Sequence, residues 1–333
     1  MIHAYAALAA SKPLEPFEYS IPPLQDDCVE IAIECCGLCY SDVHMIDNDW
    51  KNAKYPLVPG HEIVGKVTRK GKNVRELELG ARVGLGWQCG ACLKCEFCLR
   101  GDETVCSAKV RTCVDQYGGF ADKIVADSRF VYPIPAGLSP TSAAPLLCAG
   151  ITVYTPFITY KVQAPQSVAI IGIGGLGHLA LQFARAFGCQ VTAISSSPAK
   201  EQEARQLGAH HFLNVNDPTA MKNRVNAFDF ILSTAHADLD WAAIGQLLRP
   251  HGKLCFVGLP PSDVHFPVRL LISGNRCICG SGTGSRTRMA EMLQFAALHK
   301  IEPQVEVFPM KKLNEAIQRL KANQARYRIV LTN

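Results

Sequence analysis

A glycine-rich turn between an apolar strand and a helix most restricts what this chain can fold into. Residues 167–171 are an apolar run, and residues 172–177 read Gly-Ile-Gly-Gly-Leu-Gly. The segment beyond has apolar residues at helical spacing up to Phe187. In this setting a G-x-G-x-x-G turn lets the backbone approach a pyrophosphate at the helix N-terminus. We therefore predict a dinucleotide site rather than a plain tight turn, with cofactor contacts from Gly172, Gly174, Gly175, Leu176 and Gly177.

Strands and helices continue to alternate after this turn. Apolar strands are expected at residues 190–194, 228–233, 253–257 and 276–279, and helices at residues 200–207 and 239–248. Alternation of this kind is typical of an α/β domain with a doubly wound parallel (Rossmann) sheet. We assign residues 150–276 to this cofactor-binding domain.

The chain before this domain has a different rhythm. Short apolar runs punctuated by Gly, Pro and Asp occur at residues 29–35, 63–69, 81–85 and 121–126. They predict an irregular, mostly antiparallel β-barrel domain. A length of 333 residues exceeds what one hydrophobic core usually serves, so two domains are expected. We assign residues 1–149 and 277–333 to the β-rich domain, to which the tail returns.

The end of the second predicted strand indicates which dinucleotide binds. A carboxylate at this place pairs with a free ribose hydroxyl and repels a 2′-phosphate. Here the strand instead leads into Ser195, Ser196, Ser197 and, three residues later, Lys200. Hydroxyl donors and a cation suit a phosphate, so NADP(H) is favoured over NAD(H). Serines after a strand are also ordinary loop residues, which is the alternative reading.

Four cysteines with short spacing predict a closed metal site. The run C-x2-C-x2-C-x7-C lies in a polar loop that has little core to fill, and its members are Cys92, Cys95, Cys98 and Cys106. Four thiolates this close can share one tetrahedral Zn²⁺. Cys89 is an alternative fourth ligand that the spacing does not exclude.

A second, dispersed set of metal-type residues consists of Cys39, His61 and Cys148. Taken singly, each is more often structural, since a lone Cys in an apolar run usually lies in the core and a lone His is usually a satisfied polar residue. Their spacing alone does not make them a site.

Together these segments resemble the zinc-containing medium-chain alcohol dehydrogenases. The resemblance extends over essentially the whole chain and is strongest with the cinnamyl-alcohol-dehydrogenase-like branch and its bacterial aldehyde reductases. It rests on Gly-His-Glu at 60–62, the Cys₄ loop, Cys-Ala-Gly-Ile-Thr at 148–152 and the glycine turn, in the family's order. It implies a GroES-like β domain beside the Rossmann domain, and two zinc ions per chain.

The resemblance also implies roles at a catalytic zinc. Cys39, His61 and Cys148 match the three protein ligands, and Glu62 matches a carboxylate that approaches the metal during ligand exchange. Asp42 matches the residue that orients the histidine ligand. The same helix matches a proton relay, with Ser41 receiving the alcohol proton and His44 passing it on through the nicotinamide ribose. A plain helix N-cap with polar neighbours is the alternative for Ser41, Asp42 and His44.

Further cofactor contacts follow from the same resemblance. Thr152 matches a nicotinamide contact, Ser281 lies near the carboxamide position and Arg328 matches a basic contact to the pyrophosphate. Without the resemblance, an arginine that opens a last strand is simply solvated. Val257 and Leu259, which follow the strand at 253–257, complete the expected cofactor residues.

The chemistry expected is hydride transfer between NADP(H) and a primary alcohol or aldehyde, aromatic or medium-chain. A zinc ion lowers the pKa of a bound oxygen to about 7, which an alcohol needs before it gives up hydride. Aldehyde reduction is the expected direction. One alternative is a zinc-free quinone or enoyl reductase, which has no use for all three catalytic ligands. Another is a zinc-ribbon binding protein, although ribbons separate their C-x2-C pairs by about 15 to 20 residues.

Composition restricts partners and compartment. The net charge is +5 and the Lys and Arg residues are scattered, so neither nucleic acid nor an anionic membrane is indicated. The 15 cysteines are an odd number, several in apolar segments, which argues against a disulfide framework. Because residues 1–10 lack a basic leader and no run reaches eighteen apolar residues, we expect a reduced cytoplasmic enzyme. A homodimer is the first expectation for assembly and a tetramer the second.

Overall fold

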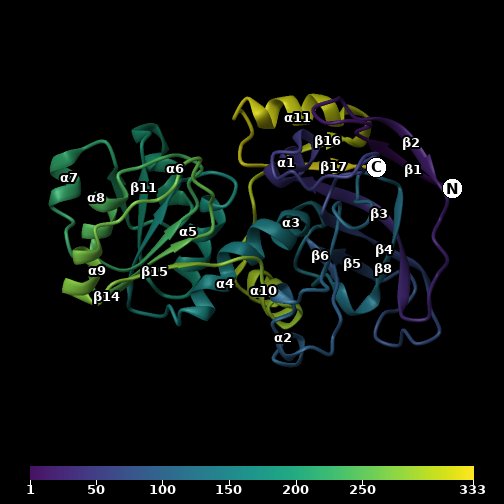
Figure 1. Cartoon of the computed structure of the whole chain (residues 1–333), viewed down its shortest axis with the longest axis horizontal. Helices are drawn as coiled ribbons and strands as arrows, with labels where there is room; N and C mark the ends of the chain where they lie inside the picture. The colour runs from purple at the N-terminus through teal and green to yellow at the C-terminus, as the bar shows by residue number, and fades with distance from the viewer. The chain divides into compact units, whose positions relative to one another are not determined.

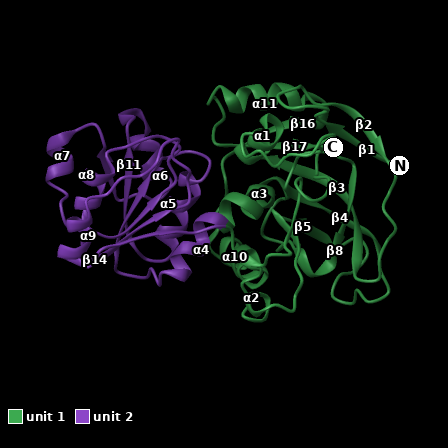
Figure 2. Cartoon of the chain, in the orientation of Figure 1, with its two compact units in different colours: residues 1–151, 283–333 green, residues 152–282 purple.

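The computed structural model describes residues 1–333 as two compact units, one formed by residues 1–151 and 283–333 and the other by residues 152–282 (Figure 2). Each unit has its own sheet and its own buried core. We call them the β-rich unit and the Rossmann unit.

The Rossmann unit contains a six-stranded, entirely parallel sheet (Figure 1). Its strand order is β12 (His211–Asn214), β11 (Gln190–Ser195), β10 (Ser167–Ile171), β13 (Phe228–Ser233), β14 (Leu248–Phe256) and β15 (Cys277–Gly280). From β10 in the middle, β11 and β12 follow on one side and β13, β14 and β15 on the other. This is the doubly wound order of dinucleotide-binding domains. The predicted α/β fold is thereby confirmed.

Helices connect these strands. They are α5 (Gly177–Ala186), α6 (Glu201–Gln206), α7 (Pro218–Lys222), α8 (Trp241–Gln246) and α9 (Val268–Gly274). Three of these elements had no counterpart in the sequence analysis: β12, α7 and α9. The first two have only four and five residues, and α9 exposes apolar side chains at Val268 and Ile272, so none has the periodicity of a half-buried element.

The end of the Rossmann unit differs from the boundary expected at residue 276. Strand β15 pairs in parallel register with β14, with Cys255 opposite Cys279, so residues 277–280 belong to the parallel sheet. The unit therefore continues to residue 282 before the chain returns to the β-rich unit. The sequence pattern marked the strand but did not say which sheet it joins.

The β-rich unit contains a seven-stranded, mostly antiparallel sheet. Its strands are β16 (Val305–Pro309), β17 (Arg328–Thr332), β3 (Cys28–Leu38), β4 (Glu62–Lys70), β5 (Arg82–Leu85) and β9 (Val131–Pro133), with β8 (Lys123–Asp127) also on β3. The C-terminal strand β17 lies antiparallel to β3, while β16 and β17 pair in parallel. Two small sheets join β1 (Ile2–Ala6) to β2 (Glu15–Tyr19) and β6 (Gln88–Gly90) to β7 (Val110–Arg111).

Short helices complete this unit. They are α1 (Tyr40–Asp47), α2 (Glu96–Leu99), α3 (Pro140–Pro145), α10 (Arg286–His299) and α11 (Leu313–Lys321). A π-helical turn at Leu146–Gly150 follows α3 and leads into α4 (Ile151–Thr159), which from Thr152 on belongs to the Rossmann unit. The continuous helical stretch Pro140–Thr159 is long and apolar enough to cross a membrane by length and composition alone, but 78% of it is buried within the protein. Core helices of soluble proteins have the same character.

Candidate active site

Four metal-type side chains from distant parts of the β-rich unit meet at one point. Cys39 lies between β3 and α1, His61 and Glu62 lie at the start of β4, and Cys148 lies in the π-helical turn. Ligand atoms of these four residues all lie within 4.8 Å of one another. Single π turns inside helices are frequent at functional sites, because they redirect a side chain.

The spacing of the sulfur and nitrogen atoms fits zinc. The sulfurs of Cys39 and Cys148 lie 3.9 Å apart, and Nε2 of His61 lies 3.3 Å from the sulfur of Cys148. Ligands on a tetrahedral Zn²⁺, with bonds of about 2.3 Å to sulfur and about 2.0 Å to nitrogen, are separated by roughly 3.5 to 3.8 Å. Two thiolates and one imidazole form the protein donor set of a catalytic zinc site, which leaves the fourth position for water or substrate.

The charges in this cluster favour a cation. A hydrogen bond with Cys148 holds the pKa of Cys39 well below its usual value, while the same contact and burial raise the pKa of Cys148. Burial alone would lower the pKa of His61, but the charges of Asp42 and Cys148 outweigh it and raise the pKa. A divalent cation would release these protons and balance the thiolates.

Glu62 and Arg328 form a buried ion pair beside the cluster. Burial raises the pKa of Glu62 to about 7, against the opposing charge of Arg328. Atoms Oε2 of Glu62 and Nε of Arg328 have no hydrogen-bond partner, so one buried carboxylate oxygen is left unpaired. The alternative of a solvated Arg328 is wrong, since its side chain is almost fully buried. The guanidinium pairs with Glu62. Its contact with the pyrophosphate stays a prediction.

The second ring nitrogen of His61, Nδ1, is hydrogen-bonded to Asp42. Oδ1 of Asp42 accepts hydrogen bonds from Nδ1 of His61 and from the amide of Gly60, both at 2.9 Å. Its Oδ2 accepts the amide of Cys39 at 2.9 Å. One buried carboxylate therefore fixes the histidine ring and also the backbone of a cysteine in the cluster. Asp42 therefore caps the start of α1, as the alternative reading has it, and also bonds to the histidine; its role at a zinc ligand stays a prediction.

The two relay residues lie on α1. Oγ of Ser41 lies 3.7 Å from the sulfur of Cys39, next to the cluster. His44, one turn further on, bonds through Nδ1 to Oδ2 of Asp49 at 2.6 Å and packs against the ring of Trp50. Asp49 was not identified from the sequence. The signal that could have found it is its position, five residues after His44.

Two indoles line the same region. The ring of Trp87 meets His61 edge-on at a centroid distance of 4.9 Å, and Trp50 meets Trp87 at 6.1 Å. Both are only partly buried. Their faces therefore offer an apolar wall next to the metal-type cluster.

The four clustered cysteines also come together. The sulfur of Cys92 lies 3.9 Å from that of Cys98 and 3.5 Å from that of Cys106, and all four ligand atoms, including that of Cys95, lie within 4.8 Å of one another. Backbone amides of Lys94 and Cys95 lower the pKa of Cys92 to about 6, which favours its thiolate. Cys89 is not part of the group, because its thiol bonds to the carbonyl of Val110 in the β6–β7 ladder.

The glycine turn has the geometry that a pyrophosphate needs. Gly172 has φ +86°, and a Cβ at Gly177 would lie 1.8 Å from the carbonyl oxygen of Gly172, so neither accepts a side chain. A Cβ at Gly174 would meet nothing within 4 Å. Helix α5 starts here without a side-chain cap, so the positive end of its dipole faces the glycine turn, where it favours an anion. Thr234, not identified from the sequence, donates to the carbonyl of Gly172 at 2.8 Å.

The serine-rich segment lies beside this turn. Nζ of Lys200 donates to the carbonyl of Ile173 at 2.7 Å, which brings the cation to the glycine turn. Ser195 is buried, and its hydroxyl accepts the amide of Ser197, so it shapes the loop. Ser196 is exposed and Ser197 half-buried.

The remaining predicted cofactor residues lie in the Rossmann unit. Thr152 is half-buried on α4, Val257 is half-buried after β14 and Leu259 is 62% exposed. The amide of Ser281 bonds to the carbonyl of Phe256 at 3.0 Å, which fixes the backbone just after β15.

Comparison with known proteins agrees with this fold. Residues 25–136 match the alcohol dehydrogenase GroES-like domain, and residues 175–297 match the zinc-binding dehydrogenase family. Aldehyde reductase AdhA from a Synechocystis species is 46% identical over 336 aligned residues, which cover 100% of this chain and 99% of that protein.

Two solved structures extend the likeness. A cinnamyl alcohol dehydrogenase from Sorghum bicolor has a TM-score of 0.95 and 40% identity, covering 99% of this chain and 97% of that one. The enzyme of the same name from Helicobacter pylori, complexed with NADP(H), has a TM-score of 0.91 and 32% identity, with coverage of 99% and 97%.

The chain belongs to the zinc-containing medium-chain alcohol dehydrogenases, in the branch that resembles cinnamyl alcohol dehydrogenases. It is an NADP-dependent zinc enzyme that interconverts alcohols and aldehydes, and its cofactors are Zn²⁺ and NADP(H). The zinc-free reductase and zinc-ribbon alternatives are thereby excluded.

Proposed function

We propose that Cys39, His61 and Cys148 hold the catalytic zinc and that Cys92, Cys95, Cys98 and Cys106 hold a structural one. The observation that carries the first assignment is the convergence of two sulfurs and one imidazole nitrogen at tetrahedral-edge distances beside a buried carboxylate. We further propose that the β-rich unit supplies both metal sites and the Rossmann unit the cofactor site.

In the proposed reaction the residues around the cluster orient the substrate and move its proton. When bound, zinc polarises the substrate oxygen and the nicotinamide carries the hydride. Ser41 lies 3.7 Å from Cys39, so its hydroxyl is close enough to the cluster to donate a proton to that oxygen. His44 restores the proton by way of the cofactor ribose, and the carboxylate of Asp49 on its Nδ1 holds the imidazole with Nε2 directed away from Asp49.

We expect His44→Ala to lower kcat at neutral pH by about 10²-fold, because general acid–base groups contribute at least that much. The loss is expected to shrink when small imidazole-type buffers replace the missing base. Asp49→Asn is the matched variant: it keeps the base but removes the carboxylate that holds its ring, so a smaller fall in kcat is expected. A parent-like kcat in both variants would remove His44 from the relay.

The adenosine end of the cofactor is assigned to the segment after β11. Ser196, Ser197 and Lys200 take the 2′-phosphate, and the glycine turn at the N-terminus of α5 takes the pyrophosphate. Support comes from Lys200, whose ammonium lies on the glycine turn through the carbonyl of Ile173. No carboxylate occupies residues 195–200 to repel a phosphate.

We expect Lys200→Ala to lower the ratio of kcat/KM for NADPH to that for NADH by about 10- to 100-fold, since a hydrogen bond to a charged group contributes about 1.5 to 3 kcal/mol. The ratio isolates the phosphate contact from any general effect on the turn. Lys222→Ala, on α7 of the same unit, is expected to leave the ratio unchanged. An unchanged ratio in Lys200→Ala would place the phosphate elsewhere.

The substrates are assigned as primary aldehydes, aromatic or medium-chain, with reduction as the working direction. The indoles of Trp50 and Trp87 support this choice, because they set flat apolar surfaces beside His61 and leave polyols without hydrogen-bond partners. Leu259 is also an apolar candidate, and it is exposed on the Rossmann unit.

The test is a steady-state panel with NADPH and with NADH, using cinnamaldehydes, benzaldehydes, aliphatic aldehydes and polyols. We expect the aromatic and medium-chain aldehydes to have the highest kcat/KM, with NADPH preferred. Trp87→Ala should selectively lower kcat/KM for aromatic aldehydes. Turnover of polyols alone would overturn the assignment.

Assembly and compartment are also proposals. A homodimer is supported by the unpaired edge of β15 and by the exposed apolar residues Val268 and Ile272 on α9 beside it. Light scattering should give twice the mass of one chain; four times the mass would support a tetramer. The cytoplasm is supported by 15 free cysteines, and fractionation of cells tests it.

A further inference from the structure

Cys113 lies against the back of the metal-type cluster without being one of the expected ligands. Its sulfur is 4.0 Å from Oδ1 of Asp42, and the ligand atoms of Asp42, His61 and Cys113 all lie within 4.8 Å of one another. All three side chains are fully buried. Cys113 therefore faces Nδ1 of His61, on the side of the ring opposite to Nε2, which faces Cys148.

The backbone at Cys113 is in an unusual conformation. Its φ is +60°, in the left-handed region that residues with a Cβ seldom adopt. Such conformations persist where the surroundings fix them, and they concentrate at functional sites. A glycine would adopt this conformation without strain, so the side chain is retained at a cost in stability.

Neighbouring contacts hold this backbone in place. Thr112 donates through Oγ1 to the carbonyl of Gly86 at 2.7 Å, and its amide donates to the carbonyl of Trp87 at 2.8 Å. On the other side, the side chain of Asp115 accepts the amide and the guanidinium of Arg111. The backbone of Cys113 is thus held by hydrogen bonds on both sides of it in the sequence. The same segment bonds to the carbonyl of Trp87, whose ring packs on His61.

We propose that Cys113 is a positioning residue of the catalytic zinc site. Its thiol is the third group on Oδ1 of Asp42, beside the amide of Gly60 and Nδ1 of His61, and it confines the carboxylate to the position from which it holds the histidine ring. The ring in turn directs Nε2 at the metal. The inference rests on the proposed assignment of His61 and Cys148 as zinc ligands.

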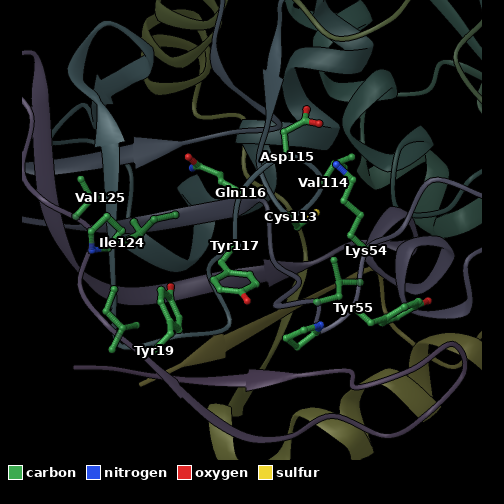
Figure 3. A pocket seen from close by; sticks show the side chains of 14 residues that line it. Tyr19, Lys54, Tyr55, Cys113, Val114, Asp115, Gln116, Tyr117, Ile124 and Val125 are labelled. Carbon is green, nitrogen blue, oxygen red and sulfur yellow. The ribbon is translucent and has the colours of Figure 1, made fainter.

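Cys113 is also one of the residues that line a pocket of about 460 Å³. Figure 3 shows this pocket, with Cys113 among the lining residues together with Tyr19, Tyr55 and Tyr117. Serine, alanine and glycine are no larger than cysteine, so these replacements at residue 113 introduce no overlap with neighbouring atoms. These variants are therefore suited to a test in the folded protein.

The experiment follows zinc release from the full-length, zinc-loaded protein to a chromogenic chelator. The catalytic zinc is identified as the phase that is missing in Cys148→Ser. We expect Cys113→Ala to speed that phase about tenfold, the lower end of the effect of losing an outer partner of a metal-bound histidine. Cys113→Ser should return it to within about threefold, since a hydroxyl also donates to Asp42.

Two further variants separate positioning from packing. Cys89→Ala removes another buried thiol of the same unit that contacts no cluster residue, and should release zinc at the parent rate. Cys113→Gly should unfold at a higher temperature than Cys113→Ala, because it relieves the positive φ, yet release zinc equally fast; it also serves if the alanine variant does not fold.

Parent-like release from both Cys113→Ala and Cys113→Gly would overturn the positioning role. Failure of the underlying ligand assignment has a different signature. In that case Cys148→Ser would keep both release phases, whatever the substitutions at residue 113 do.

Discussion

Replacing Cys148 with serine is expected to lower kcat for NADPH-dependent aldehyde reduction by about 10³-fold and to remove one of two zinc ions per chain. Cys148 contacts both other proposed protein ligands, at 3.9 Å from the sulfur of Cys39 and 3.3 Å from Nε2 of His61. A hydroxyl is a poor zinc ligand beside thiolate, and Lewis-acid polarisation supplies several kcal/mol to the reaction, which corresponds to about three powers of ten in rate.

The matched control is Cys189→Ser, which alters an equally buried thiol in the Rossmann unit, away from any metal-type group. It should retain two zinc ions and the parent kcat. The measurement combines zinc quantification by mass spectrometry with initial rates on the same samples. A Cys148→Ser protein with two zinc ions and the parent kcat would show that the ligand set is wrong.

The second large effect is expected at the Cys₄ loop. Cys106→Ser should remove the other zinc ion and lower the unfolding temperature by about 10 °C or more, because structural zinc contributes its binding free energy to folding. The loop has little else to order it: α2 has four residues, and Phe97, Leu99 and Val105 are exposed. One half-buried ion pair, between Glu103 and Arg286, connects the loop to α10.

Cys89→Ser is the control for this prediction. Its thiol is three residues from the loop but bonds to Val110 instead of the cluster, so the variant should keep both zinc ions and an unfolding temperature near that of the parent. Thermal unfolding followed by circular dichroism, with zinc counted before and after, provides the measurement. Loss of zinc from Cys89→Ser and not from Cys106→Ser would mean that Cys89 is the fourth ligand.

Features encoded by neighbouring residues could be predicted from the sequence. The strand Ser167–Ile171 and the strand Phe228–Ser233 have the predicted bounds, and the helix after the glycine turn begins at Gly177. Apolar periodicity and glycine placement are local signals, so they survive folding unchanged. The cluster of Cys92 to Cys106 was visible for the same reason, since all its ligands lie in one short loop.

Features that depend on distant segments could not be derived from spacing. Cys39, His61 and Cys148 are brought together by three different elements, and only the family resemblance suggested them. The burial of Arg328 on Glu62 follows from the pairing of β17 with β3 next to β4, which no local pattern encodes. Asp49 and Cys113 were missed because a single acidic residue or cysteine carries no periodic signal.

The central claim is that a zinc ion at Cys39, His61 and Cys148 makes this chain an NADPH-dependent aldehyde reductase. The most direct measurement is the rate of NADPH and NADH oxidation with cinnamaldehyde before zinc removal by a chelator, after it, and after zinc is added back. We predict NADPH-preferring activity that disappears with the zinc ion whose release phase is missing in Cys148→Ser, and that returns in proportion to zinc restored. Undiminished activity in protein free of zinc would contradict the claim.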